Sequence, residues 1–215
     1  MKINRDKFFS VARELVFDGQ IKDPKQVEGL NRILDYWESW PDKDLRRLSY
    51  VLATVHWETG KTFQPVREAY WLSENWRKNN LRYYPYYGRG DVQLTWKENY
   101  IKMGNLLGIN LVDNPDKALD PSISVQVLFE GMYKAESGLG DFTQQSLDQY
   151  FNDTVDDPKG ARKIVNGTDK DDEIAAIYEE YLVAVKQSVE QTTQSPQLTI
   201  WERFIKWLVS LFSGG

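Results

Sequence analysis

Residues 44–60, DLRRLSYVLATVHWETG, decide the fold class because they combine a helical apolar stripe with clear end signals. Apolar side chains recur every three or four residues, as on one face of an α-helix, at Leu45, Leu48, Leu52 and Val55. Pro41 and Asp42 supply a start signal, and Gly60 supplies a stop. We therefore predict a core helix that ends near Glu58.

The segments on either side of this helix indicate a mainly α-helical chain. The same spacing predicts helices at 5–17, 26–39, 96–107, 122–136, 145–151 and 171–190. Residues 61–95 are irregular and rich in Tyr, Asn, Arg, Pro and Gly, and residues 91–95 are the best of few strand-like runs. The fold class is therefore predicted as mainly α, with very little β.

The composition of the 215-residue chain argues against several classes of function. There is no cysteine, hence no thiol nucleophile, disulfide or cysteine-bound zinc. His56 is the only histidine, whereas zinc hydrolases usually take two or three histidine ligands, so we expect no metal and no other cofactor. The formal net charge of −5 argues against a nucleic-acid partner.

The hydropathy pattern shows no targeting or membrane-spanning segment. The N-terminus interleaves apolar and charged residues and lacks the apolar stretch of a signal peptide. No run approaches the roughly 18 apolar residues of a transmembrane helix. We therefore expect synthesis in the cytoplasm without a signal peptide.

Two glutamates are candidates for acid–base chemistry. Glu58 falls at the end of the predicted core helix, where partial burial and the negative end of the helix dipole favour a protonated carboxyl. Glu68 follows in the irregular stretch FQPVREAY, with Glu74 as the alternative. Glycoside hydrolysis needs one carboxyl that donates a proton and one that activates water or forms a glycosyl ester. Two glutamates ten residues apart are common, so an ordinary surface role for both stays open.

Four motifs in order resemble the family 19 chitinases and the phage or bacterial lysozymes that share their fold. They are HWETG (56–60), QPVREAY (64–70), YYGRGDVQLTWKENY (86–100) and ARKIVNGTDK (161–170). The similarity covers roughly residues 1–187. It implies a lysozyme-like, two-lobed helical domain with a substrate groove between the lobes.

The resemblance also implies roles for individual residues. Glu58 matches the general acid, and Glu68 matches the second acidic position, which is expected to activate water by an inverting route. Gln93 and Thr95 match groove residues that bind sugar and hold that water, and Asn166 matches an asparagine of the same family. One departure is that the family usually has histidine directly before the catalytic glutamate, where this chain has Trp57.

Aromatic and basic side chains near these motifs have two interpretations each. Tyr83, Tyr84, Tyr86, Tyr87 and Trp96 suit either stacking on sugar rings or core packing, and we take Tyr87 and Trp96 as substrate-binding candidates. Arg162 and Lys163 can contact acidic groups of a substrate, but solvated surface positions are the expectation for both.

Three functions follow from the resemblance. The first is a muramidase that cleaves the β-1,4 glycan strand of peptidoglycan, acting at the bacterial cell wall as a phage or prophage lytic enzyme. The second is a chitinase, which the missing cysteines and signal peptide disfavour because chitinases of this family usually carry both. The third is a glycan-binding module without activity, disfavoured by the retained Glu58 and QLT motif.

The C-terminal region is predicted to lie outside the catalytic domain of residues 1–187. Residues 188–199 are polar, contain Pro196 and are predicted to be a linker. Residues 200–213 place their apolar side chains on one broad arc of a helix. This amphipathic helix is expected to contact a membrane, to dock on the domain, or to pair with its copy.

Overall fold

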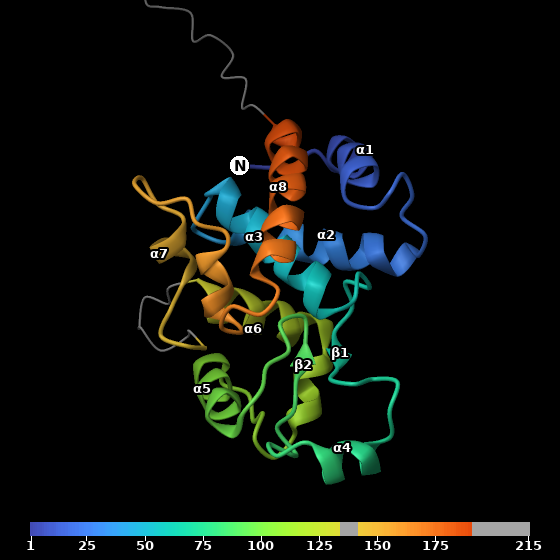
Figure 1. Cartoon of the computed structure of the whole chain (residues 1–215), viewed down its shortest axis with the longest axis vertical. Coiled ribbons are helices and arrows are strands. Elements are labelled where there is room, and N and C mark those ends of the chain that lie inside the picture. The colour runs from blue at the N-terminus through green and yellow to red at the C-terminus, as the bar shows by residue number, and fades with distance from the viewer. Residues whose placement is uncertain (134–141, 191–215) are drawn as a thin grey trace, which may run out of the picture.

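The computed structural model of the chain describes residues 1–133 and 142–190 (Figure 1). Its helices are α1 (Arg5–Leu15), α2 (Pro24–Ser39), α3 (Leu45–Glu58), α4 (Glu74–Asn80), α5 (Lys97–Leu107), α6 (Pro121–Met132), α7 (Leu147–Tyr150) and α8 (Asp171–Ser188), with short 3₁₀ helices at Pro115–Leu119 and Gly160–Ile164. Two short strands, β1 (Val66–Arg67) and β2 (Arg89–Gly90), pair antiparallel. The prediction of a mainly helical fold with very little β is confirmed.

Polar residues start most of these helices. The side chains of Asn4, Asp23, Asp44, Ser73 and Asp120 each accept a hydrogen bond from a backbone N–H in the first turn. Such capping satisfies donors that have no partner within the helix. Proline adds to the start signal in the first turn of α2 and of α6, where a missing N–H costs nothing.

Helix α3 lies at the centre of the helical lobe formed by α1, α2, α3 and α8. Its residues from Leu48 to His56 are all buried, so along this part of the helix burial extends from the apolar stripe to every side. Helix α8 packs against both α1 and α3 (Figure 1). Because α3 is held by this packing, the position of its last residue, Glu58, is fixed as well.

The second lobe contains β1, β2, α4 and α5, in the lower half of Figure 1. Asp91, directly after β2, is fully buried and joins this lobe to the helical one. Its carboxylate accepts two hydrogen bonds from Arg32 of α2, at 2.7 and 2.8 Å, and one from the Ser124 hydroxyl of α6 at 2.7 Å. A paired, hydrogen-bonded charge is the form in which a carboxylate tolerates burial.

Residues 91–95 do not form the predicted strand. They make a tight turn closed by two backbone hydrogen bonds between Arg89 and Leu94, and Gln93 has a φ of 55°. The apolar alternation is real, since Val92 and Leu94 are buried. Val92 and Leu94 pack a turn rather than a strand, because the Asp91 carboxylate is buried in the core by its pairing with Arg32.

The end of the described chain returns to its beginning. Asn4 N–H donates to the Ser188 carbonyl at 2.7 Å, and Glu190 N–H donates to the Lys2 carbonyl at 3.0 Å. Residues 188–190, predicted as the first part of a linker, therefore pair with residues 2–4. The rest of the linker and the helix predicted at 200–213 lie outside the described residues. Within the described ranges no helix is long and apolar enough to cross a membrane.

Candidate active site

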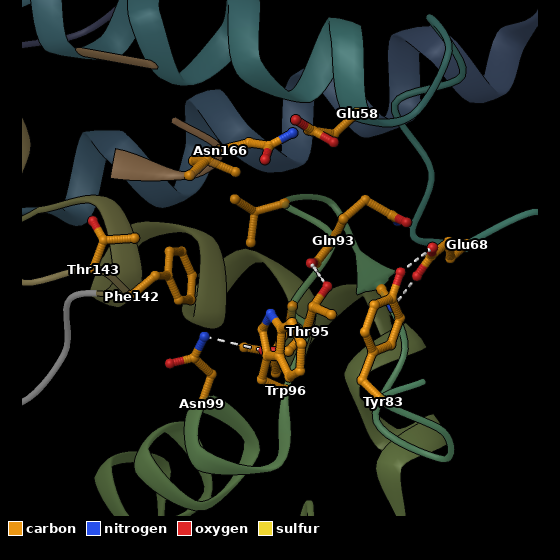
Figure 2. A pocket seen from close by; sticks show the side chains of 14 residues that line it. Glu58, Glu68, Tyr83, Gln93, Thr95, Trp96, Asn99, Phe142, Thr143 and Asn166 are labelled. Atoms are coloured by element: carbon orange, nitrogen blue, oxygen red, sulfur yellow. Dashed lines mark hydrogen bonds between the residues drawn. The ribbon is translucent and has the colours of Figure 1, made fainter. Parts of the chain in front are cut away.

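A cavity of about 640 Å³ lies between the two lobes. Six of the seven predicted site residues line it, and these are Glu58, Glu68, Gln93, Thr95, Trp96 and Asn166. Figure 2 shows Glu58 and Glu68 reaching it from different elements, with Gln93 between them in this view. The structure thus brings together residues that are up to 108 positions apart in the sequence. We call this space the central cavity.

The turn that follows α3 holds Glu58 at the cavity. Thr59 N–H and the Thr59 hydroxyl both donate to the Val55 carbonyl, and the same hydroxyl accepts from Phe63 N–H at 3.0 Å. Gly60 has a φ of 57°, which glycine adopts without steric cost. The chain therefore leaves the helix directly after Glu58, and the carboxyl ends at the helix terminus.

The Glu58 carboxyl is largely buried and paired. Its side chain is 15% exposed, and Glu58 Oε1 accepts a hydrogen bond of 2.6 Å from Arg162 Nη1. Burial raises the pKa of Glu58, the Arg162 charge and hydrogen bond lower it, and the nearby Asp169 carboxylate raises it. The net result is a pKa above the ordinary glutamate value. A raised pKa suits a group that must donate a proton near neutral pH.

Arg162 is a site residue that the sequence analysis missed. We expected a solvated side chain, but Arg162 is 2% exposed and its Nε donates to the Asp169 carbonyl at 2.8 Å. It lies in the 3₁₀ helix Gly160–Ile164, only four residues before Asn166. The only sequence signal for a role of Arg162 in the site is its place in the ARKIVNG motif. Its pairing with Glu58 could not be predicted locally, because the two residues are 104 positions apart.

His56, the only histidine, belongs to the core rather than to the catalytic pair. Its ring is buried among Phe17, Phe63 and Tyr181, and Nδ1 lies 3.2 Å from the Tyr181 hydroxyl oxygen. Burial, with a smaller effect of the Lys61 charge, lowers the pKa of His56 to about 4. The imidazole is therefore neutral at physiological pH and supports the end of α3 by packing.

Glu68 is held by two donors on the side of the cavity that belongs to the second lobe. Glu68 Oε1 accepts from the Tyr83 hydroxyl at 2.6 Å, and Oε2 accepts from Gly88 N–H at 2.9 Å (Figure 2). Burial and the Glu68 carboxylate together raise the pKa of Tyr83 to about 12, so the phenol keeps its proton. Accepting hydrogen bonds at both oxygens is what an ionised carboxylate does, and each oxygen retains a lone pair for a further donor.

Thr95 and Gln93 each use part of their hydrogen-bonding capacity for structure. The Thr95 hydroxyl donates to the Gln93 carbonyl at 2.7 Å, which leaves its oxygen free only to accept. Gln93 Nε2 donates to the carbonyls of Val66 and Gly90, so it ties the turn to both strands. A Cβ at Gly88 would lie 2.7 Å from Gln93 Oε1, so a larger residue there would displace the Gln93 side chain.

Trp96 and Asn166 lie on the exposed margin of the central cavity. Trp96 packs edge-on against Tyr83 with ring centroids 5.0 Å apart, and the Arg82 guanidinium lies over its ring at 5.0 Å. Asn166 follows the Arg162 helix and is exposed. Asn166 and Glu58 both line the central cavity (Figure 2). The side chains of Trp96 and Asn166 are placed to meet a ligand.

Tyr87 is the exception among the predicted site residues. Its ring is buried, with the Arg89 guanidinium 3.6 Å from the ring centroid, and its hydroxyl donates to Glu74 Oε2 at 3.0 Å. Tyr87 therefore packs the second lobe and does not line the central cavity, contrary to its expected place at the substrate. The carboxylate of Glu74 accepts this hydrogen bond from Tyr87 and lines a different cavity. Glu74 therefore does not replace Glu68 as the candidate for the second catalytic carboxylate.

No group of acidic or histidine side chains with the geometry of a metal site occurs in the described part of the chain. What the central cavity does contain is one carboxyl with a raised pKa and one carboxylate fixed by two donors. This pair can donate a proton on one side of a bound molecule and accept one on the other.

Comparison with known proteins supports the predicted resemblance. Residues 59–137 match the family model for class I chitinases, the family 19 glycoside hydrolases. Endochitinase WIN8 of Populus trichocarpa is 55% identical over 42 residues, which are 19% of this chain and 13% of the relative. Chitinase 8 of Oryza sativa subsp. japonica is 62% identical over 32 residues, 15% and 12% of the two chains. The resemblance to family 19 is therefore confirmed.

These matches are limited in extent. The chain covers only about an eighth of the length of these relatives, and Glu58 lies one residue before the family match. A bacterial family 19 chitinase of known structure aligns over 87% of this chain and 96% of its own, at 18% identity and a TM-score of 0.48. A relative from Hevea brasiliensis named as an inactive chitinase-like protein is 55% identical over 31 residues, 14% of this chain and 10% of its own.

Proposed function

We propose that the protein is a glycoside hydrolase that cleaves β-1,4 bonds in a polymer of N-acetyl amino sugars. The observation that carries this proposal is the pair of carboxyls in the central cavity, delivered by different lobes and held in different environments. A glycosidase needs this division of labour, because one carboxyl must hold a proton while the other must lack one.

Glu58 acts as the general acid. Its burial favours the protonated form, and Arg162 holds Oε1, so Oε2 is the oxygen that faces the leaving group. The proton passes to the glycosidic oxygen as the bond to the anomeric carbon breaks. Arg162 also limits the rise of the pKa, which keeps the proton transferable.

Glu68 acts as the base, with Thr95 as its partner in holding water. The Thr95 hydroxyl proton is committed to the Gln93 carbonyl, so Thr95 Oγ1 accepts from a water molecule. The second proton of that water is directed to Glu68, which is fixed by Tyr83 and Gly88. The activated water attacks the anomeric carbon from the side opposite to the leaving group, and the configuration inverts.

The favoured substrate is a chitin-type chain. The sequence alone favours peptidoglycan, but the matching family model and the relatives from Populus trichocarpa and Oryza sativa are named as chitinases, which favours N-acetylglucosamine polymers over alternating strands. Both polymers present the same β-1,4 bond and N-acetyl groups, so the cavity chemistry is common to them. Cleavage of peptidoglycan by a lytic enzyme remains the alternative outcome of the test.

The test uses two substrates and mass spectrometry of the released products. We expect the full-length protein to cut chitin hexamer into shorter oligomers, and to do so faster than it releases fragments from purified sacculi. Release of muropeptides with no cleavage of the hexamer would replace chitin by peptidoglycan. If the protein binds both polymers and cuts neither, the proposal of hydrolysis is wrong and a glycan-binding role takes its place.

A further inference from the structure

We propose that Tyr70, Trp71 and Trp76 form a second glycan-binding surface, which holds the polymer outside the central cavity. We call these three residues the aromatic patch. The identity of its ligand rests on the proposed function, but its binding role does not depend on turnover. Nothing in the predicted catalytic machinery uses these side chains.

The aromatic patch is unusual in its exposure. Tyr70 is 60% exposed, Trp71 72% and Trp76 37%. In the described part of the chain only one other aromatic residue, Trp96 at the cavity margin, is as exposed as Trp76. Single exposed apolar residues are ordinary, but three exposed aromatic side chains within seven residues of the sequence are a concentration that commonly marks an interaction site.

The geometry of the patch gives it open ring faces. Tyr70 and Trp71 meet edge to face, with centroids 5.1 Å apart and an interplanar angle of 83°. This contact leaves the rings at right angles and exposed, instead of collapsing them onto one another. The face of an indole or phenol ring packs well against the apolar C–H face of a pyranose, while the ring edge can meet hydroxyl groups.

The chain fixes the patch relative to Glu68. Arg77, which is buried, donates from Nε to the Glu68 carbonyl at 2.8 Å and from Nη2 to the Ala69 carbonyl at 3.0 Å. Trp76 N–H donates to the Ser73 side chain at the start of α4. Figure 1 shows this segment leaving β1 and running to α4 at the edge of the second lobe. The exposed rings are therefore presented at a set position next to the Glu68 side of the cavity.

The chemistry of the patch fits an uncharged polymer. Between Tyr70 and Trp76 the only charged side chain is the acidic one of Glu74, so nothing within this stretch attracts a polyanion. Continuity with the cavity favours the same glycan, because Tyr70 lies only two residues beyond Glu68. A chain of linked N-acetyl amino sugars that extends past Glu68 meets the patch with its successive ring faces.

The experiment measures adsorption to insoluble chitin, and to purified sacculi, in a Glu58→Gln background. Removing turnover in this way separates binding from hydrolysis. We expect Trp71→Ala combined with Trp76→Ala to weaken adsorption about tenfold, because two ring contacts are lost. Trp71→Phe, which keeps a ring, should retain most of the adsorption. In the otherwise wild-type chain, the double variant should cleave the short chitin tetramer at the normal rate.

Leu15→Ala is the matched control, since Leu15 is an exposed apolar residue at the end of α1, in the other lobe. Its adsorption and thermal midpoint should equal those of the parent. Unchanged adsorption of the double variant to both polymers would overturn the proposal, as would an equal loss in Leu15→Ala. If wild type fails to cut any oligomer while the double variant still loses adsorption, the proposed hydrolysis fails and the binding surface stands.

Discussion

Burial and the ion pair with Arg162 have opposite effects on the pKa of Glu58. Burial favours the neutral acid, and the guanidinium favours the carboxylate, with burial prevailing. An acid stabilised by burial alone would hold its proton more firmly and transfer it less readily. Arg162 is therefore a positioning residue that orients the Glu58 carboxyl and sets its proton affinity.

The pH profile of an Arg162→Met variant tests this role. Activity requires protonated Glu58, so it is lost as the pH rises through the pKa of this group. Removing Arg162 removes an influence that lowers that pKa, and the alkaline limb of kcat/KM should move to higher pH. Arg162→Lys, which keeps the charge, should shift the limb less. An alkaline limb that stays in place in Arg162→Met contradicts the assignment of this limb to Glu58.

His56 gives a second prediction at the residue scale, on stability. Its pKa is about 4 in the folded protein and 6.5 without the fold, so the unfolded chain binds the proton more readily. The stability that neutral His56 contributes is therefore present above pH 6.5 and lost as the pH falls towards 4. The loss is on the order of 3 kcal/mol. Urea unfolding of wild type and His56→Phe across this window should show a shallower pH dependence in the variant, and equal slopes would contradict this.

Sequence reasoning located the two glutamates but not all of their partners. The position of Glu58 could be predicted because an apolar stripe and a stop signal locate the end of one helix. Tyr87 and Arg162 were misassigned because burial of a polar or charged side chain depends on partners far along the chain. Arg89 packs on the ring of Tyr87, and Glu58 pairs with Arg162. No local pattern distinguishes these contacts.

At the scale of elements, the Asp91 contacts join the β1–β2 lobe to helices α2 and α6. Replacing Asp91 with Ala removes a fully buried carboxylate, which leaves the Ser124 hydroxyl without its acceptor and Arg32 without its counter-charge. Breaking a buried pair from one side typically costs about 3–5 kcal/mol. The thermal midpoint of Asp91→Ala should fall strongly, and that of Ser124→Ala should fall less. A midpoint for Asp91→Ala within a degree or two of wild type contradicts this account.

Most helices were predictable because their caps and apolar spacing are local signals, but α4 lies within residues 61–95, which were predicted to be irregular. Helix α3 was expected over 44–58 and extends from Leu45 to Glu58. Residues 91–95 were not predictable in the same way. Their alternation of apolar residues is that of a strand, but the buried Asp91 and the positive φ of Gln93 convert it to a turn.

At the scale of the whole molecule, the two lobes place the acid and the base on different elements around one cavity. If Glu68 activates water and forms no bond to the sugar, the configuration at the anomeric carbon must invert. Proton NMR of chitin hexamer cleavage should therefore show the α-anomer as the first product. Initial release of the β-anomer would contradict the role of Glu68 as base and indicate a covalent or substrate-assisted route.

The central claim is that Glu58 donates the proton in glycoside hydrolysis. Glu58→Gln tests it directly, because the amide oxygen can still accept from Arg162 while the transferable proton is lost. General acid catalysis is typically worth about 10²–10⁴-fold, so turnover of chitin hexamer should fall by that order while the thermal midpoint stays near that of wild type. Turnover above about a tenth of the wild-type rate, in a folded variant, would contradict the account.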